Sequence, residues 1–176
     1  MSRFLSKASE SLLPYTPGEQ PQGRKFIKLN TNECPYPPSP KVAEAILAGY
    51  EENSSKIMPL ELANLRLYSD PEERVLIEAI ADHYGVGTNQ VIAGNGSDEI
   101  LGFAFRAFCD QNAPLQFADL TYGFYPALCG LYGIPFKVVP LEEDFTLNIE
   151  PYKNCGNNVI IANPNAPTGM NLPLSA

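Results

Sequence analysis

The chain has no tryptophan and a single histidine, and it carries little positive charge. Its 12 lysines and arginines are outnumbered by 20 aspartates and glutamates, and the net charge of −8 argues against a nucleic-acid surface or a polybasic membrane patch. Long hydrophobic runs are missing as well: no segment approaches the roughly 20 apolar residues of a membrane span, and the N-terminus lacks a signal-peptide core. We therefore expect a cytoplasmic protein whose partner is a small molecule.

Cysteines are few and far apart, and no two of them form a C-x-x-C pair. Only His83 could join them as a nitrogen ligand, which argues against a zinc site. His83 extends the apolar side of a predicted helix, so we interpret it as a helix-end residue rather than a catalytic one. In a reducing compartment the sequence predicts free thiols at Cys34, Cys109, Cys129 and Cys155.

Apolar residues make up 44% of the 176-residue chain, enough for a substantial core in a single domain. From residue 91 onward, apolar runs at 91–93, 115–118, 136–139 and 159–162 predict strands, and amphipathic stretches at 97–108 and 123–132 predict helices. The run at 159–162 is typical of a strand buried on both faces. This alternation predicts an α/β fold with a mainly parallel sheet flanked by helices and joined by right-handed crossovers.

Another helix is expected to start at residue 71, just after Asp70. Asp70 suits an N-cap, Pro71 the first helical position and Glu73 a capping box, while Gly85 suits the C-cap. Its buried side is predicted from four apolar residues at helical spacing, which are Val75, Leu76, Ala79 and Ile80.

Residues 91–101, which read VIAGNGSDEIL, predict a strand that passes through a two-glycine turn into a helix. The glycines allow a sharp bend, Ser97 suits an N-cap, and the helix dipole favours an anion such as phosphate. Asp98 and Glu99 would repel that anion, so binding would depend on backbone N–H groups and the Ser97 hydroxyl. The alternative interpretation is a plain strand-to-helix turn with a capping serine.

Ligands of parallel α/β sheets bind beyond the carboxyl ends of the strands. Three segments are expected to converge there, namely residues 94–97, 119–122 and 163–169. Tyr122 could offer an aromatic face to a flat ligand, and ordinary packing of the ring is the alternative.

Four motifs in order carry a family resemblance. NPNAPTG at 163–169 is similar to the N-P-x-N-P-T-G signature of the class I and II, fold-type I aminotransferases, which depend on pyridoxal phosphate (PLP). KLNTNECPYPPSP at 28–40, YSDP at 68–71 and GNGSDE at 94–99 are similar to motifs of the histidinol-phosphate aminotransferases within that class. The resemblance spans about residues 28 to 173 and implies the N-terminal part of the PLP-dependent transferase fold.

The resemblance also implies a domain organisation and a cofactor site. An N-terminal arm would occupy residues 1–27, and an incomplete class I and II aminotransferase domain residues 28–176. Gly96, Ser97 and Asp98 would hold the PLP phosphate, and Tyr122 would stack on the pyridine ring. The further implied contacts are Tyr68 to the cofactor of the neighbouring subunit, Asn165 to the cofactor, and Asn32 and Tyr36 to the substrate.

The implied reaction is amino transfer between an amino donor and 2-oxoglutarate, catalysed by a homodimer. In the histidinol-phosphate branch, the donor is histidinol phosphate and the product is imidazole-acetol phosphate. Aminotransferases for aromatic amino acids and a phosphothreonine decarboxylase branch share these motifs.

Two departures from the family pattern argue against activity of these 176 residues by themselves. The imine-forming lysine of the family matches no residue here, and family chains are about twice as long. Ala166 stands where the family has an asparagine that donates to the cofactor, and the loss of such a bond costs about 1.5 to 3 kcal/mol. The alternatives are a non-catalytic remnant or binding module of the same scaffold, and a nucleotide-binding α/β domain.

Overall fold

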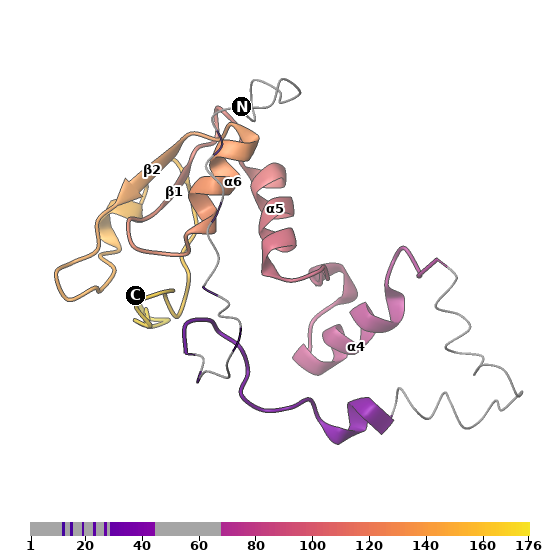
Figure 1. The fold of residues 1–176 in the computed structure, drawn as a ribbon. Helices are drawn as coiled ribbons and strands as arrows, with labels where there is room; N and C mark the ends of the chain where they lie inside the picture. Colours follow the sequence, from indigo (N-terminus) through magenta and orange to yellow (C-terminus); the bar gives the residue numbers. More distant parts are fainter. Residues whose placement is uncertain are drawn as a thin grey trace, which may run out of the picture. The chain divides into compact units, whose positions relative to one another are not determined.

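The computed structural model describes residues 12, 15, 19, 23, 27, 29–44 and 68–176. They fall in two compact units: a larger unit formed by Met1–Pro17 and Gly94–Ala176, and a smaller unit formed by Gly18–Ala93. In the smaller unit residues 40–44 are helical, and α4 (Arg74–Tyr84) and η1 (Thr88–Gln90) follow. The larger unit contains α5 (Ser97–Phe108), β1 (Leu115–Ala118), α6 (Phe124–Tyr132), β2 (Phe136–Val139), η2 (Glu150–Tyr152) and β3 (Asn158–Val159) (Figure 1).

The larger unit is built on a three-stranded sheet in the order β2-β1-β3. Both pairings are parallel, with Leu115 opposite Phe136 on one side and Asn158 on the other. The predicted parallel sheet and the predicted strands at 115–118 and 136–139 are therefore confirmed. The chain passes from β1 to β2 through α6, which is the crossover helix that parallel strands require.

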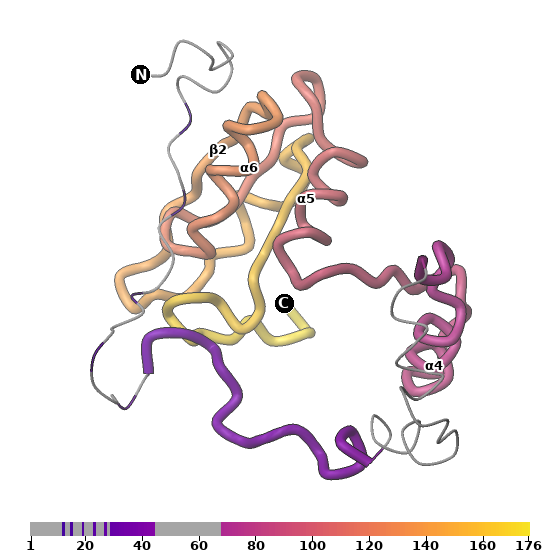
Figure 2. Tube along the Cα trace, turned by 45° about the vertical axis from the view of Figure 1, so that its right-hand side comes forward, coloured from indigo at the N-terminus to yellow at the C-terminus, as the bar shows by residue number. Residues whose placement is uncertain are grey.

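Helices α5 and α6 lie side by side and share one apolar core with β1 (Figures 1 and 2). Successive side chains of a strand point to opposite faces, and Leu115 and Phe117 both point to this core. The buried members of the core are Phe105, Leu115, Phe117, Tyr125, Leu128, Cys129 and Ile134. The helices predicted at 97–108 and 123–132 are confirmed, and α6 ends at Gly133, whose φ of 66° is the left-handed conformation of a C-cap glycine.

A polar contact fixes η2 and the segment after it to β1. Gln116 is fully buried, and its Nε2 donates to the carbonyl oxygen of Pro151 at 2.8 Å. Its Oε1 accepts from Nδ2 of Asn157 at 3.0 Å. A buried amide left without partners would destabilise the fold, so these contacts make the polar residue tolerable in the middle strand.

Two strand predictions are wrong. The strand expected at 159–162 is reduced to the two-residue edge strand β3, and Val159 is 41% exposed. The apolar run at 159–162 has the composition of a buried strand. Such a strand is buried when it has a pairing strand on each side, and among the described residues β3 pairs with β1 alone. Residues 91–93 form no strand, because no described residue pairs with them in a β-ladder.

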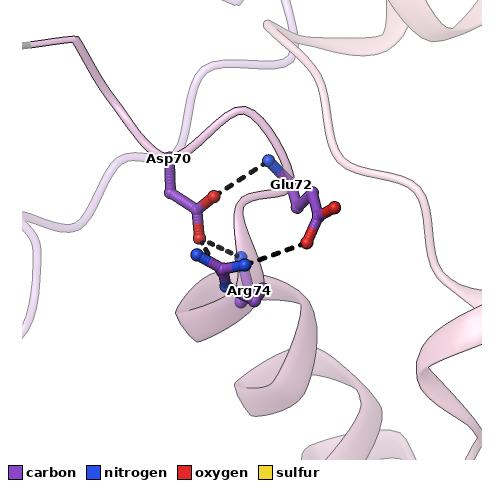
Figure 3. A network of polar contacts seen from close by, with 3 residues as sticks. All are labelled: Asp70, Glu72 and Arg74. Carbon is purple, nitrogen blue, oxygen red and sulfur yellow. Dashed lines mark hydrogen bonds and ion pairs between the residues drawn. The ribbon is translucent and has the colours of Figure 1, made fainter.

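In the smaller unit the helix starts later than the sequence predicts, after the contacts of Asp70, Glu72 and Arg74 (Figure 3). Helix α4 begins at Arg74, three residues later than predicted. The Asp70 carboxylate accepts from the backbone N–H of Glu72 at 3.1 Å and of Arg74 at 3.3 Å. The Arg74 guanidinium pairs with Asp70 and Glu72, each at 3.0 Å. Aspartate followed by proline also suits the first two positions of a β-turn, and here the turn is formed, closed by the Glu73 N–H to the Asp70 oxygen.

The far end of α4 agrees with the prediction, whereas its expected buried side does not. Gly85 is the C-cap, with φ of 67° and its N–H directed to the carbonyl oxygens of Ala81 and Asp82. Val75 is 83% exposed and Leu76 is 51% exposed. Periodicity establishes that an apolar side exists, but burial needs a packed partner, which the described residues of this unit do not supply.

Cys34, Cys109, Cys129 and Cys155 are free thiols, and Cys129 is buried. Among the described residues there is no group of three or more potential metal ligands. No helix in the described part of the chain is long and apolar enough to cross a membrane.

Candidate functional site

The turn before α5 has a conformation that only glycine adopts easily. Gly96 has φ of 83° and ψ of 172° and is the N-cap of α5, and no side chain caps the helix. The predicted capping role of Ser97 is therefore wrong, because Ser97 is already the first helical residue. At Gly94 a Cβ would lie 2.7 Å from Cδ1 of Ile100, so a larger residue there would displace the end of that side chain.

The first turn of α5 leaves backbone donors available. The N–H of Ile100 bonds to the Gly96 oxygen at 3.4 Å, and the N–H of Gly96 bonds to the Gly94 oxygen at 3.0 Å. For the N–H groups of Ser97, Asp98 and Glu99 there is no acceptor among the residues that the structure describes. Together with the positive end of the helix dipole, these three donors form an environment that suits an anion.

The acidic side chains of this turn are held in contacts of their own. Oε2 of Glu99 accepts from the backbone N–H of Asn95 at 2.6 Å, which resembles the reach-back contact of a capping box. Oδ1 of Asp98 accepts from the Tyr122 hydroxyl at 2.6 Å. Each carboxylate thus accepts a hydrogen bond from a neighbouring loop. These contacts lessen the repulsion of an anion that the sequence predicts for Asp98 and Glu99.

Tyr122 joins an aromatic cluster next to the turn. Its ring centroid lies 5.6 Å from Tyr125, 6.3 Å from Phe124 and 6.1 Å from Tyr15 of the N-terminal segment. Burial raises the pKa of the Tyr122 phenol above its usual range, and the hydrogen bond to Asp98 raises it further. The phenol is therefore neutral at physiological pH, and both its ring and its hydroxyl are held by neighbours.

Asn165 connects the loop after β3 with the loop after β1. Its Oδ1 accepts from the Thr121 hydroxyl at 2.9 Å. Its Nδ2 donates to the Leu120 carbonyl oxygen at 2.9 Å and to the Thr168 hydroxyl at 2.9 Å. Both amide hydrogens of Asn165 are thus in use. Ala166, beside it, is half-buried, and the Ala166–Pro167 peptide bond is cis, as is Asn163–Pro164.

The three segments expected to converge do meet. Residues 121 and 122 are at the centre: Thr121 bonds to Asn165 in the 163–169 loop, and Tyr122 bonds to Asp98 in the first turn of α5. The other predicted site residues, Asn32, Tyr36 and Tyr68, belong to the smaller unit and are exposed there. Their roles stay predictions.

Sequence reasoning included Asp119 and Thr121 in the 119–122 segment without giving either a role, and it missed Tyr15. Oδ1 of Asp119 accepts from the backbone N–H of Leu120 at 2.8 Å and of Leu141 at 3.0 Å, which holds the ends of β1 and β2 together. Aspartate just after a strand is a recognisable signal for such a contact. Thr121 and Tyr15 carried no comparable signal, because their partners are distant in sequence.

A cavity of about 130 Å³ lies beside the 163–169 loop and is separate from the first turn of α5. Its lining is mostly apolar, and it includes Asn165 but neither Tyr122 nor residues 96–98. The residues around it are Leu141, Phe145, Thr146, Leu147, Ile161, Ala162, Asn165, Met170, Asn171, Leu172 and Pro173.

Comparison with known proteins gives a consistent result. Histidinol-phosphate aminotransferase of Pseudomonas putida (strain W619) is 48% identical over 176 residues, which are 100% of this chain and 47% of that protein. Histidinol-phosphate aminotransferase 1 of Methylococcus capsulatus is 50% identical, over 99% of this chain and 46% of that protein. The chain therefore spans about half the length of the curated relatives it matches.

Among solved structures, histidinol-phosphate aminotransferase from Sinorhizobium meliloti in complex with pyridoxal-5'-phosphate has a TM-score of 0.71. It is 24% identical, and the match covers 95% of this chain and 44% of that one, so this likeness concerns the fold. The predicted fold class is thereby confirmed. The sequence model of aminotransferase class I and II matches residues 24–176. This match covers most of the chain, and the protein belongs to the aminotransferase class I and II family.

Proposed function

We propose that this chain contributes the phosphate-binding part of a PLP-dependent aminotransferase of the histidinol-phosphate type. The observation that carries the proposal is the Tyr122 ring beside the first turn of α5, tied to it through Asp98. Relatives that are 48% and 50% identical over essentially the whole chain are histidinol-phosphate aminotransferases, which supports this substrate class.

The residues present fit the cofactor. The N–H groups of Ser97, Asp98 and Glu99 suit the phosphate, and a Cβ built on Gly96 would meet no atom within 4 Å, so the turn is open at that point. Of the residues expected to bind the phosphate, Ser97 and Asp98 would do so through their backbone N–H groups and the Ser97 hydroxyl. Gly96, whose own N–H bonds to the Gly94 oxygen, would contribute the open turn. The neutral, immobilised ring of Tyr122 would lie against the pyridine ring.

The remaining roles belong to the same proposal. Asn32 and Tyr36 would contact the substrate, Tyr68 would reach the cofactor of the neighbouring subunit in a homodimer, and Asn165 would belong to the cofactor site. The proposal also includes an N-terminal arm at residues 1–27, an incomplete aminotransferase domain at residues 28–176 and a cytoplasmic location. PLP, when bound, supplies the electron sink for amino transfer to 2-oxoglutarate. The described residues of this chain bind and orient it, and we expect no turnover by the chain alone.

The experiment compares PLP with pyridoxal, which lacks the phosphate. We expect equilibrium dialysis to show PLP bound at least tenfold more tightly than pyridoxal, with inorganic phosphate as a competitor, because the donors of α5 recognise the phosphate. Ser97→Ala should weaken PLP binding about fivefold and leave pyridoxal unaffected, and Ser175→Ala, an exposed serine elsewhere, is the matched control. Equal affinity for PLP and pyridoxal would contradict the proposal, and absence of binding would favour a non-catalytic remnant.

A further inference from the structure

Every hydrogen of the Asn165 side-chain amide is used inside the protein. Its two hydrogens go to the Leu120 carbonyl and the Thr168 hydroxyl, and its oxygen receives the Thr121 hydroxyl, all at 2.9 Å. The backbone of Asn165 is equally committed, since its N–H bonds to the Met170 oxygen at 2.8 Å and its oxygen accepts from Gly169 at 2.7 Å. An amide with this many internal partners is a structural connector more than a donor to a ligand.

The two loops that Asn165 connects follow adjacent parallel strands. Leu120 and Thr121 come just after β1, and Asn165 comes after β3, so their contact spans 44 residues of sequence. The next residue after Thr121 is Tyr122, whose hydroxyl is bonded to Asp98. A shift of Thr121 would therefore change the position of the Tyr122 ring relative to α5.

We propose that Asn165 is a positioning residue that acts through Thr121 to hold Tyr122 beside the first turn of α5. This inference rests on the proposed function for its consequence, because the ring it positions is the one assigned to the cofactor. It replaces direct donation by Asn165 with an indirect role. Asn165 lies next to Ala166, and this role of Asn165 does not depend on the asparagine that the family has at position 166.

Two variants interrupt the connection from opposite ends. Thr121→Val keeps the shape of the side chain and removes the hydroxyl, and Asn165→Ala removes the amide. Thr121→Ser retains a hydroxyl and is the conservative control. If the two residues act as one connection, the double variant Thr121→Val with Asn165→Ala should change Tyr122 little more than Asn165→Ala alone.

The first measurement follows Tyr122 without any cofactor. Tyrosine labelled at the ring carbon that bears the hydroxyl gives one NMR signal per residue, and Tyr122→Phe identifies the signal of Tyr122. We expect that signal to move in Thr121→Val and Asn165→Ala, to return in Thr121→Ser, and to leave Tyr152, buried in η2, unchanged. A Tyr122 signal that stays in place in both variants would overturn the inference, even if the variants lower stability.

The second measurement uses PLP itself. If Asn165 positions Tyr122 through Thr121, the variants Thr121→Val and Asn165→Ala should weaken PLP binding by similar factors, about fivefold each. Weakening confined to Asn165→Ala would mean that Asn165 donates to the cofactor directly and would overturn the inference. If the unaltered chain binds no PLP, the proposed function fails for this chain, while the NMR signal of Tyr122 still decides whether Asn165 positions it.

Discussion

The Tyr122 hydroxyl donates a 2.6 Å hydrogen bond to Oδ1 of Asp98, across 24 residues of sequence. One residue belongs to the loop after β1 and the other to the first turn of α5, so the contact joins a strand end to a helix N-terminus. It directs the Asp98 carboxylate, the acidic group next to Ser97, toward a neutral donor. The exposed backbone N–H groups of the same turn are thereby left for an anion.

Replacing Tyr122 by phenylalanine tests this contact. The aromatic ring remains, so the core is preserved, but the hydrogen bond to the carboxylate is lost. We expect the free energy of unfolding to fall by about 1 kcal/mol, because the acceptor Asp98 is solvent-exposed and recovers part of its hydration. Urea unfolding measures the change. The double variant Asp98→Asn with Tyr122→Phe should lower the free energy of unfolding by no more than the sum of the two single variants. A fall well above this value would show that the ring packing had also changed.

Gly96→Ala tests the conformation of the turn. Because φ is 83° and ψ is 172°, alanine there should lower the free energy of unfolding by about 1 to 3 kcal/mol. Gly130→Ala is the control: it lies within α6, where a Cβ would make an ordinary 3.5 Å contact with Leu12, and alanine favours the helix by roughly 0.5 to 1 kcal/mol. Thermal unfolding followed by circular dichroism compares the two. Equal melting temperatures would mean that residue 96 does not need the glycine conformation.

The carboxyl group of Asp70 should titrate below its ordinary pKa. The backbone N–H of Glu72 is the main cause of the lower pKa, and the contacts with Arg74 contribute to it. A lowered folded-state pKa gives stability that is present above the unfolded-state value of 3.8 and is lost as the pH falls through the folded-state value. Side-chain NMR titration measures this pKa, and Arg74→Gln should bring it partly back toward 3.8. A carboxyl that titrates at or above that value would refute the hydrogen bonds and ion pairs of Asp70 drawn in Figure 3.

The four cysteines should react with a thiol reagent in an order set by burial. Cys34 is exposed and should react first, whereas burial raises the pKa of Cys129 to about 12 and should make it the slowest. Cys34→Ser should remove the fast phase of the reaction, which mass spectrometry of labelled peptides can verify. Rapid labelling of Cys129 in the folded protein at neutral pH would contradict the packing of α6.

The raised pKa of Cys129 also sets a dependence of stability on alkaline pH. Its folded-state pKa of about 12 lies above the unfolded-state value of 9.0, so the contribution is complete below pH 9.0 and is lost as the pH rises toward 12. Tyr122 acts in the same direction at higher pH, because its folded-state pKa is also raised. We expect the urea midpoint to fall as the pH rises above 9.0, and a midpoint that rises there would be inconsistent with both shifts.

Local patterns in the sequence were sufficient for most elements of the larger unit. The alternation of apolar runs with amphipathic stretches predicted β1, β2, α5 and α6, since these patterns reflect a periodicity that each segment carries within itself. Gly85 was predicted as a C-cap for the same reason, because a left-handed residue needs no distant partner. The two glycines before α5, and Tyr122 just after β1, marked segments that the structure brings close together through the contact of Tyr122 with Asp98.

Errors arose where two local solutions have similar energies or where a distant partner is required. Asp70 and Pro71 fit both a helix start and a β-turn, and the turn was formed. Val75 and Leu76 carry the periodicity of a buried side without being buried, and the run at 159–162 has a buried composition at an edge of the sheet. In each case the sequence pattern indicates which structure a segment could adopt, and the packing of the folded chain decides whether the segment adopts it.

The sequence by itself determined the family, the succession of α5, β1, α6 and β2, and the glycines that shape the turn before α5, because motifs and short-range periodicity are properties of contiguous residues. Only the tertiary structure decided that Asp98 accepts from Tyr122 and that Asn165 holds Thr121. These partners lie 24 and 44 residues apart. Thr121 and Asn165 meet because β1 and β3 are parallel neighbours whose carboxyl ends lie at one edge of the sheet, whereas Asp98 reaches Tyr122 because α5 packs on the core that it shares with β1.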